Sequence, residues 1–156
     1  MEFNPAKCKA ITITKKTRPV KTEYKLHDQI LAAVESAKYL VVNISSNLFW
    51  NTHIDTTAKK ATQTLNFVHR NFSCCPMSIR EQCYKTLVRS QLEYASSVWD
   101  NPVKRNITKI EAVQRSAARF TCRDYKRTSS ITAMLQKLQY DSLQLRQARS
   151  RVLMLY

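Results

Sequence analysis

Apolar and polar residues alternate along much of the first 46 residues, whereas from residue 54 onward apolar residues recur at spacings of three and four. A period of two is typical of half-buried strands, and a period near 3.6 of amphipathic helices. The change of period predicts an α+β fold, with a small N-terminal antiparallel β-sheet in residues 1–46 and a mostly antiparallel helical bundle in residues 47–156. The expected strands, about four in one sheet, are residues 9–14, 22–26, 30–34 and 38–44.

Residues 78–100 carry the widest apolar face of the chain and are predicted to form a central helix. At 100° per residue, apolar side chains fill roughly 220° of the helix, interrupted only by Arg80, Glu81 and Gln91. So wide a face must be covered by several neighbours. Ser78 and Glu81 match the S-x-x-E capping box, which predicts where the helix begins. The apolar residues of this face are Ile79, Cys83, Tyr84, Leu87, Val88, Leu92, Tyr94, Ala95, Val98 and Trp99.

Four further helices are predicted around the central one. The first covers residues 54–72 and ends before Pro76, so it should run antiparallel to the central helix, which Pro102 is expected to stop. The next opens at Thr108, where Glu111 completes a second capping box. Two more are expected at residues 131–138 and 142–156. The predicted inward faces are Ile54, Ala58, Ala61, Leu65, Val68 and Phe72; Ile110, Val113, Ala117 and Phe120; and Leu145, Ala148, Val152 and Leu155.

The composition excludes several enzyme classes. The chain contains no glycine, so it cannot form a P-loop, a dinucleotide-binding loop or a GxSxG elbow, each of which needs glycine. Its five cysteines form no C-x-x-C pair, and its three histidines lie at no metal-ligand spacing from them. We expect reduced thiols and an intracellular protein, nuclear or cytoplasmic, because there is no signal peptide and no apolar run long enough to span a membrane.

The charge indicates a polyanionic partner. The formal net charge is +15, from 26 Lys and Arg against 11 Asp and Glu. Arg115, Arg119 and Arg123 follow one another at intervals of four, which places like charges along one helix face unless a partner neutralises them. Residues 104–127 hold eight basic and two acidic side chains, with Lys126 and Arg127 at the end. This pattern predicts a phosphate-binding stripe, or else a solvated arginine face or arginines that pair with acids on a neighbouring helix.

Three blocks of the chain resemble a known family. They are YLVVNISSNLFWNTHI (39–54), LVRSQLEYASSVWD (87–100) and IEAVQRSAARF (110–120). Their order and spacing closely resemble the C-terminal part of the reverse transcriptases of non-LTR retrotransposons, the jockey-like and related LINE elements. In that family the blocks are approximately YLGV.I...L.W..HI, LVRPQLEYAS.VWDP and IE.VQRRAARF. The start of the chain, FNPAKC, is similar to the family's motif D at the end of the palm.

The resemblance implies roles for individual residues. Lys7 falls at the motif D lysine, which in such polymerases lies near the triphosphate of the incoming nucleotide. Tyr39, Leu40 and Val41 fall in motif E, the primer-grip hairpin. Val41 replaces the family's glycine, so we expect primer gripping to be impaired. Ser90 replaces a proline, which should favour an uninterrupted helix through this position.

The helices from residue 56 onward would correspond to the thumb and the region that follows it. A thumb-like bundle of this family holds RNA and RNA:DNA duplexes without sequence specificity. On that view the stripe of Arg115, Arg119 and Arg123 faces nucleic acid. The local excess of positive charge adds Lys126 and Arg127 as candidate nucleic-acid-binding residues.

The chain lacks the carboxylates of a polymerase. Phosphoryl transfer by this family needs paired acids that hold two metal ions, and they lie upstream in the palm. The acidic residues here include no adjacent pair and no D-x-D sequence. We therefore expect a truncated copy that begins after the catalytic palm, needs no cofactor and does not polymerise DNA alone, with Mg²⁺ required only in the full-length polymerase. The alternative is an inert or protein-interacting helical relic.

Overall fold

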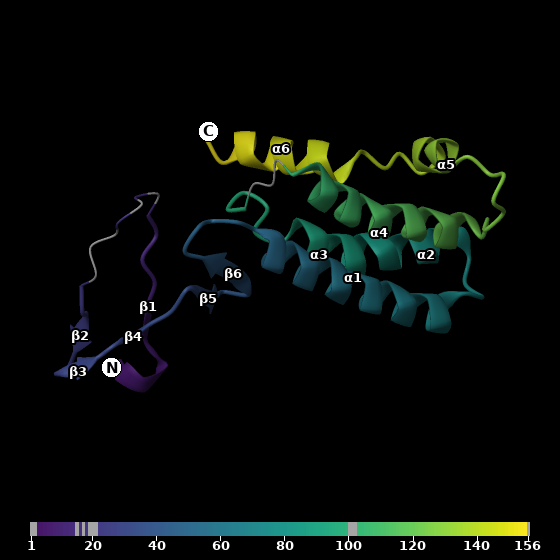
Figure 1. Ribbon diagram of the computed structural model, residues 1–156. Coiled ribbons are helices and arrows are strands. Elements are labelled where there is room, and N and C mark those ends of the chain that lie inside the picture. Colours follow the sequence, from purple (N-terminus) through teal and green to yellow (C-terminus); the bar gives the residue numbers. More distant parts are fainter. Residues whose placement is uncertain (1–2, 15, 17, 19–21, 100–102, 156) are drawn as a thin grey trace. The chain divides into compact units, whose positions relative to one another are not determined.

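The computed structural model describes residues 3–14, 16, 18, 22–99 and 103–155. The chain forms two compact units, residues 1–53 and residues 54–156. Short strands occur in the first unit and helices make up the second (Figure 1), which confirms the predicted α+β class. The division falls in the first turn of helix α1 (Asn51–Phe72).

The described residues of the first unit form three separate two-stranded pairs. β1 pairs with β4 in parallel, whereas β2 with β3 and β5 with β6 are antiparallel. The predicted single antiparallel sheet of about four strands is therefore wrong. The elements are the 3-10 turn η1 (Pro5–Lys7), β1 (Lys9–Ala10), β2 (Lys25–Leu26), β3 (Gln29–Ile30), β4 (Ala32–Ala33), β5 (Ser36–Tyr39) and β6 (Val42–Ser45).

The predicted strand at residues 38–44 is instead a hairpin. Leu40 and Val41 have positive φ angles of 43° and 70° and form the two-residue turn between β5 and β6. Two central residues with positive φ are typical of the tight hairpin turn that matches the twist of its strands. Among the described residues of this unit, only Val42 and His53 are buried. The unit therefore has very little core of its own.

The second unit is a helical bundle in which adjacent helices are mostly antiparallel (Figure 1). The central helix comprises α2, the π-helix η2 and α3 in direct succession, residues 77–93. It runs antiparallel to α1, with Gln91 donating to Thr64 at 3.1 Å, and to α4, with Tyr84 donating to Gln114 at 2.8 Å. The bounds are α2 (Met77–Cys83), η2 (Tyr84–Arg89), α3 (Ser90–Glu93), α4 (Lys104–Cys122), α5 (Ile131–Lys137) and α6 (Leu143–Leu153).

The central helix is shorter than predicted. It ends at Glu93, and Ala95 has a positive φ of 52°. Trp99 folds back, fully buried, and its indole nitrogen donates to the Tyr94 carbonyl at 3.0 Å. Burial of this large side chain competes with continuation of the helix. The predicted stop at Asn101 and Pro102 lies outside the described residues.

Both predicted capping boxes are wrong. The residue that caps α2 is Pro76, so Ser78 lies inside the helix. Helix α4 begins at Lys104, and the Thr108 hydroxyl donates to the Lys104 carbonyl at 2.9 Å instead of capping. The S-x-x-E and T-x-x-E patterns are short, and a helix that can start one turn earlier or at a proline overrides them.

The predicted apolar face of the central helix is only partly buried. Tyr84, Val88 and Leu92 are buried at spacings of four, whereas Ile79 and Leu87 are nearly half exposed. The wider turn of the π-helix keeps residues four apart on one side and turns their neighbours outward. Serine at position 90 keeps the segment helical through this region, as expected, but not as a regular α-helix.

The inward faces of α1 and α4 are confirmed, because Ile54, Leu65 and Val68, and likewise Ile110 and Phe120, are buried.

The predicted inward face of α6 is wrong. Its predicted residues Leu145, Val152 and Leu155 are exposed. The helix packs instead through buried Leu143 and through Arg146, whose guanidinium forms two hydrogen bonds with the Glu93 carboxylate of α3.

Candidate nucleic-acid interface

The C-terminal end of α4 carries the densest group of predicted binding residues. The segment that links α4 to α5, residues 123–130, is named the basic loop here and contains Arg123, Lys126 and Arg127. Two backbone hydrogen bonds end helix α4 at the start of this loop. The Asp124 amide donates to the Arg119 carbonyl at 3.1 Å, and the Arg123 amide donates to the Phe120 carbonyl at 3.2 Å. These two bonds form a Schellman motif.

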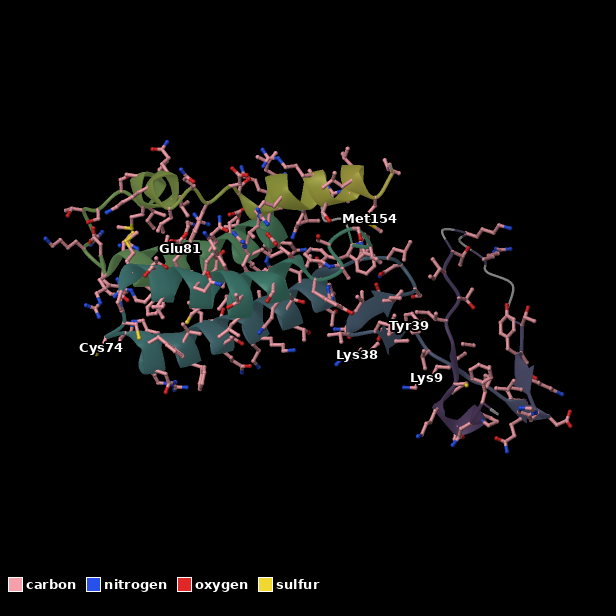
Figure 2. All side chains as sticks on the ribbon, turned by 180° about the vertical axis from the view of Figure 1, so that it is seen from behind. Lys9, Lys38, Tyr39, Cys74, Glu81 and Met154 are labelled. Atoms are coloured by element: carbon pink, nitrogen blue, oxygen red, sulfur yellow. The ribbon has the colours of Figure 1, made fainter. Side chains whose placement is uncertain are left out.

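Arg123 occupies the position of that motif where glycine is preferred. Its φ is 54°, in the left-handed region. The backbone therefore turns sharply at this residue, and Arg123 lies outside the helix. Its guanidinium donates to the Ser73 carbonyl in the loop between α1 and α2. Figure 2 labels Cys74 of that loop, at the opposite end of the bundle from Met154.

The predicted row of three arginines is not a continuous stripe. Arg119 donates forward to the Lys126 carbonyl at 3.0 Å, which ties the basic loop to α4. Arg115 donates backward to the Thr108 carbonyl at 3.4 Å and lines a shallow groove between α4 and α5. The structure thus brings Arg119, but not Arg115, together with the basic loop.

A buried arginine lies beneath this end of the bundle. Arg80 of α2 is 5% exposed, and its guanidinium donates to the carbonyls of Thr121 at 2.7 and 3.2 Å, Cys75 at 2.9 Å and Ser73 at 3.4 Å. It also lies over the ring of Phe120, 6.0 Å from the centroid. Its positive charge is favourable beside the C-terminal carbonyls of a helix.

Arg80 therefore fixes the α1–α2 loop against the end of α4. In the sequence, Arg80 is distinguished only as a polar residue within an apolar arc. That mismatch was the available signal, because a charged side chain on a buried face must find internal partners.

The only acid of the basic loop is Asp124. Hydrogen bonds from the Ser129 side chain and from the Lys126 amide, at 3.1 Å, hold the pKa of Asp124 below its ordinary value, with a smaller contribution from nearby cations. The carboxylate is therefore ionised at neutral pH and orders the loop. It offsets only part of the positive charge carried by Arg119 and the loop.

Tyr125 lies in the middle of the basic loop and was not singled out from the sequence. A hydrogen bond of 2.9 Å joins its hydroxyl to Nε2 of His69 on α1, and the two rings meet edge to face. The His69 ring packs in turn on buried Phe120, with centroids 5.3 Å apart. Partial burial raises the pKa of Tyr125, opposed by Arg80 and Arg123, so the phenol stays neutral at neutral pH.

Lys126 and Arg127 are exposed. Within the described part of the chain, neither side chain forms a hydrogen bond or an ion pair, unlike Arg119 and Arg123. These two cations are available to an external anion without loss of an internal contact.

The predicted site residues of the first unit lie in exposed turns. Lys7 ends the 3-10 turn η1 and is exposed. Tyr39 ends β5, and Leu40 and Val41 form the hairpin turn, all three exposed. Val41 adopts a positive φ of 70°, in the region that favours glycine, and the hairpin nevertheless forms. Figure 2 labels Tyr39 and its neighbour Lys38 on this hairpin.

Among the residues that the structure describes, no three His, Cys, Asp or Glu side chains are grouped to hold a metal ion. In the same residues, no helix is both long and apolar enough to cross a bilayer. Comparisons with protein-family models, curated proteins and solved structures yield no match to this chain.

Proposed function

We propose that the chain is the C-terminal, nucleic-acid-binding part of a non-LTR retrotransposon reverse transcriptase, an RNA-directed DNA polymerase, and does not synthesise DNA alone. The observation that carries this proposal is the end of the bundle at the basic loop. There, Arg119 and Arg123 are fixed by backbone carbonyls, Lys126 and Arg127 are exposed, and one ionised acid opposes them.

The charge of the second unit supports a polyanionic partner. Residues 54–156 contain 18 Lys and Arg against 7 Asp and Glu, a formal excess of +11. Cations that contact phosphates release condensed counterions, which gives affinity without sequence specificity. The expected ligand is therefore RNA or an RNA:DNA duplex, bound through its phosphates.

The residues that carry the family resemblance support a common architecture. In the second block, Gln91 forms a hydrogen bond with Thr64 of α1, and Glu93 accepts hydrogen bonds from Arg146 of α6. Trp99 is buried beyond the end of the helix. In the third block, buried Gln114 accepts from Tyr84 and donates to the Asp141 carbonyl at 2.9 Å. Residues that join helices in this way are the ones a thumb-like bundle must retain, whether or not its polymerase is active.

The test is fluorescence anisotropy of a labelled RNA:DNA duplex across a salt series. We compare the double variant Lys126→Ala and Arg127→Ala with Lys59→Ala and Lys60→Ala, which removes the same charge from exposed positions on α1. The first pair should lower the slope of log affinity against log salt by about 2, because each lost phosphate contact removes about 0.9. The control pair should lower it by much less.

Equal effects of the two pairs would refute an interface at the basic loop, and absence of salt-dependent binding by the folded protein would refute the proposed function. Arg119 and Arg123 are left in place because their removal would also release the loop. Mg²⁺-dependent primer extension by the pure protein would contradict the proposed lack of catalysis.

A second candidate is a protein-interacting role. The end of α6 and the residues after it expose Val152, Leu153, Met154 and Leu155. A continuous apolar stretch of this kind is typical of a surface that packs against protein. A folded chain that binds no nucleic acid would favour this alternative.

A further inference from the structure

Tyr125 is an exposed aromatic residue surrounded by cations. It is 57% exposed, and Arg123, Lys126 and Arg127 lie within two residues of it in the basic loop. An aromatic ring so exposed contributes little to the core, because most of its surface remains in water. Its place in the loop is therefore not explained by packing.

The ring is nevertheless held in one orientation. Its hydroxyl is bonded to Nε2 of His69, and the interplanar angle of 74° shows that the two rings do not stack on each other. His69 is itself packed on Phe120, which is buried. A contact through the hydroxyl end fixes the ring on the core without His69 covering its faces.

The flanking backbone is fixed as well. The guanidinium of Arg123 anchors one side of the loop to Ser73, and that of Arg119 binds the Lys126 carbonyl on the other side. Asp124, bonded to the Lys126 amide, closes the turn between them. The ring and the backbone that carries the cations are thus positioned before any ligand arrives, which reduces the entropy lost on binding.

An oriented aromatic face beside exposed cations is the arrangement that binds unpaired nucleotides. The base stacks on the ring and the adjoining phosphates contact the cations, with little dependence on sequence. In a continuous duplex the base faces are covered by their neighbours, so a duplex can use the cations but not the ring.

We infer that Tyr125 is a stacking platform for an unpaired base, and that the basic loop binds single-stranded nucleic acid in preference to continuous duplex. This inference rests on the proposed nucleic-acid-binding function and adds the class of ligand. The bases of RNA and DNA offer the same stacking face, so single-stranded RNA and single-stranded DNA are both expected to bind.

The experiment uses the full chain with short single-stranded RNA and DNA oligonucleotides that carry 2-aminopurine, and a blunt duplex for comparison. Tyr125→Leu removes the ring, Tyr125→Phe keeps the ring and loses the bond to His69, and Tyr24→Leu is the control at an exposed tyrosine of the first unit. Circular dichroism verifies that each variant is folded.

Tyr125→Leu should weaken single-strand binding about 5- to 150-fold, the range for loss of one base–aromatic stack, and abolish quenching of 2-aminopurine at the bound position. Tyr125→Phe should retain most of both, and Tyr24→Leu all of both. Duplex binding should change little in any variant. RNA and DNA oligonucleotides tested separately show whether the sugar contributes.

Salt-dependent single-strand binding that Tyr125→Leu leaves unchanged would overturn the stacking role while the proposed function stands. Equal affinity of the original chain for single strand and blunt duplex would overturn the preference. Absence of salt-dependent binding to every oligonucleotide by the folded chain would overturn both the inference and the proposed function.

Discussion

Because the chain contains no glycine, its left-handed backbone positions are occupied by other residues. The strain at one of them, Gln139, can be tested directly by substitution. This exposed residue follows α5 and has a φ of 53°. Its amide donates to the Gln136 carbonyl at 3.0 Å and the Tyr140 amide donates to the Leu135 carbonyl at 2.9 Å. The two bonds form a Schellman motif, in which the left-handed position is normally glycine.

Gln139→Gly should stabilise the protein. A residue with a Cβ pays roughly 1–2 kcal/mol to adopt the left-handed conformation. Glycine avoids that cost but loses more backbone freedom on folding, about 0.5–1 kcal/mol. The expected net gain in the free energy of unfolding is therefore about 0.5–1 kcal/mol, and no side-chain hydrogen bond recorded for the described residues is lost with Gln139.

Gln82→Gly provides a control with the same composition. Gln82 is exposed inside the central helix, where glycine should cost about 0.5–1 kcal/mol. Equilibrium urea unfolding followed by circular dichroism measures both variants, and the m-value should not change. The two free energies should move in opposite directions from the original chain. A Gln139→Gly variant as unstable as Gln82→Gly would refute the assignment of strain to this turn.

Two further predictions concern the end of the bundle. Arg80→Met, which keeps much of the side-chain volume, should lower the free energy of unfolding by about 3 kcal/mol, because the carbonyls of Thr121 and Cys75 lose a buried donor; urea unfolding measures this, and a neutral result would contradict it. Asp124 has a lowered pKa, so its stabilisation is full above the ordinary pKa of an aspartate and is lost as the pH falls through the lowered value. Asp124→Asn should accordingly lower the melting temperature at neutral pH and not at strongly acidic pH, and an equal deficit at both pH values would contradict this.

The apolar period predicted the helices well where one face of a regular α-helix is buried. It identified the buried residues Ile110 and Phe120 of α4 and the stripe of α1 because burial there follows 3.6 residues per turn. It failed in the central helix, where a π-helix changes the period and Trp99 turns the chain back. Both features depend on which neighbours cover the helix, and this information is not local.

The turns could not be predicted from their usual signal. Among the described residues, eight have a positive φ although none is glycine. Val41 is the clearest case, because a β-branched residue in the left-handed region is unfavourable. The alternating pattern of a segment that contains it therefore predicts one long strand, whereas the pairing of Tyr39 with Val42 places a hairpin turn there.

The candidate interface shows what a count of charges can and cannot predict. Spacing at four predicted that Arg115, Arg119 and Arg123 share a face, but the helix ends before Arg123, and the guanidinium groups of Arg119 and Arg123 bind the carbonyls of Lys126 and Ser73 outside the helix. Arg119 and Arg123 therefore fix the backbone of the basic loop. Lys126 and Arg127 are the cations of this loop that can contact a ligand. Two available cations give a weak, salt-sensitive contact, so a second source of affinity is needed at this end of the bundle, and the oriented ring of Tyr125 is placed to supply it.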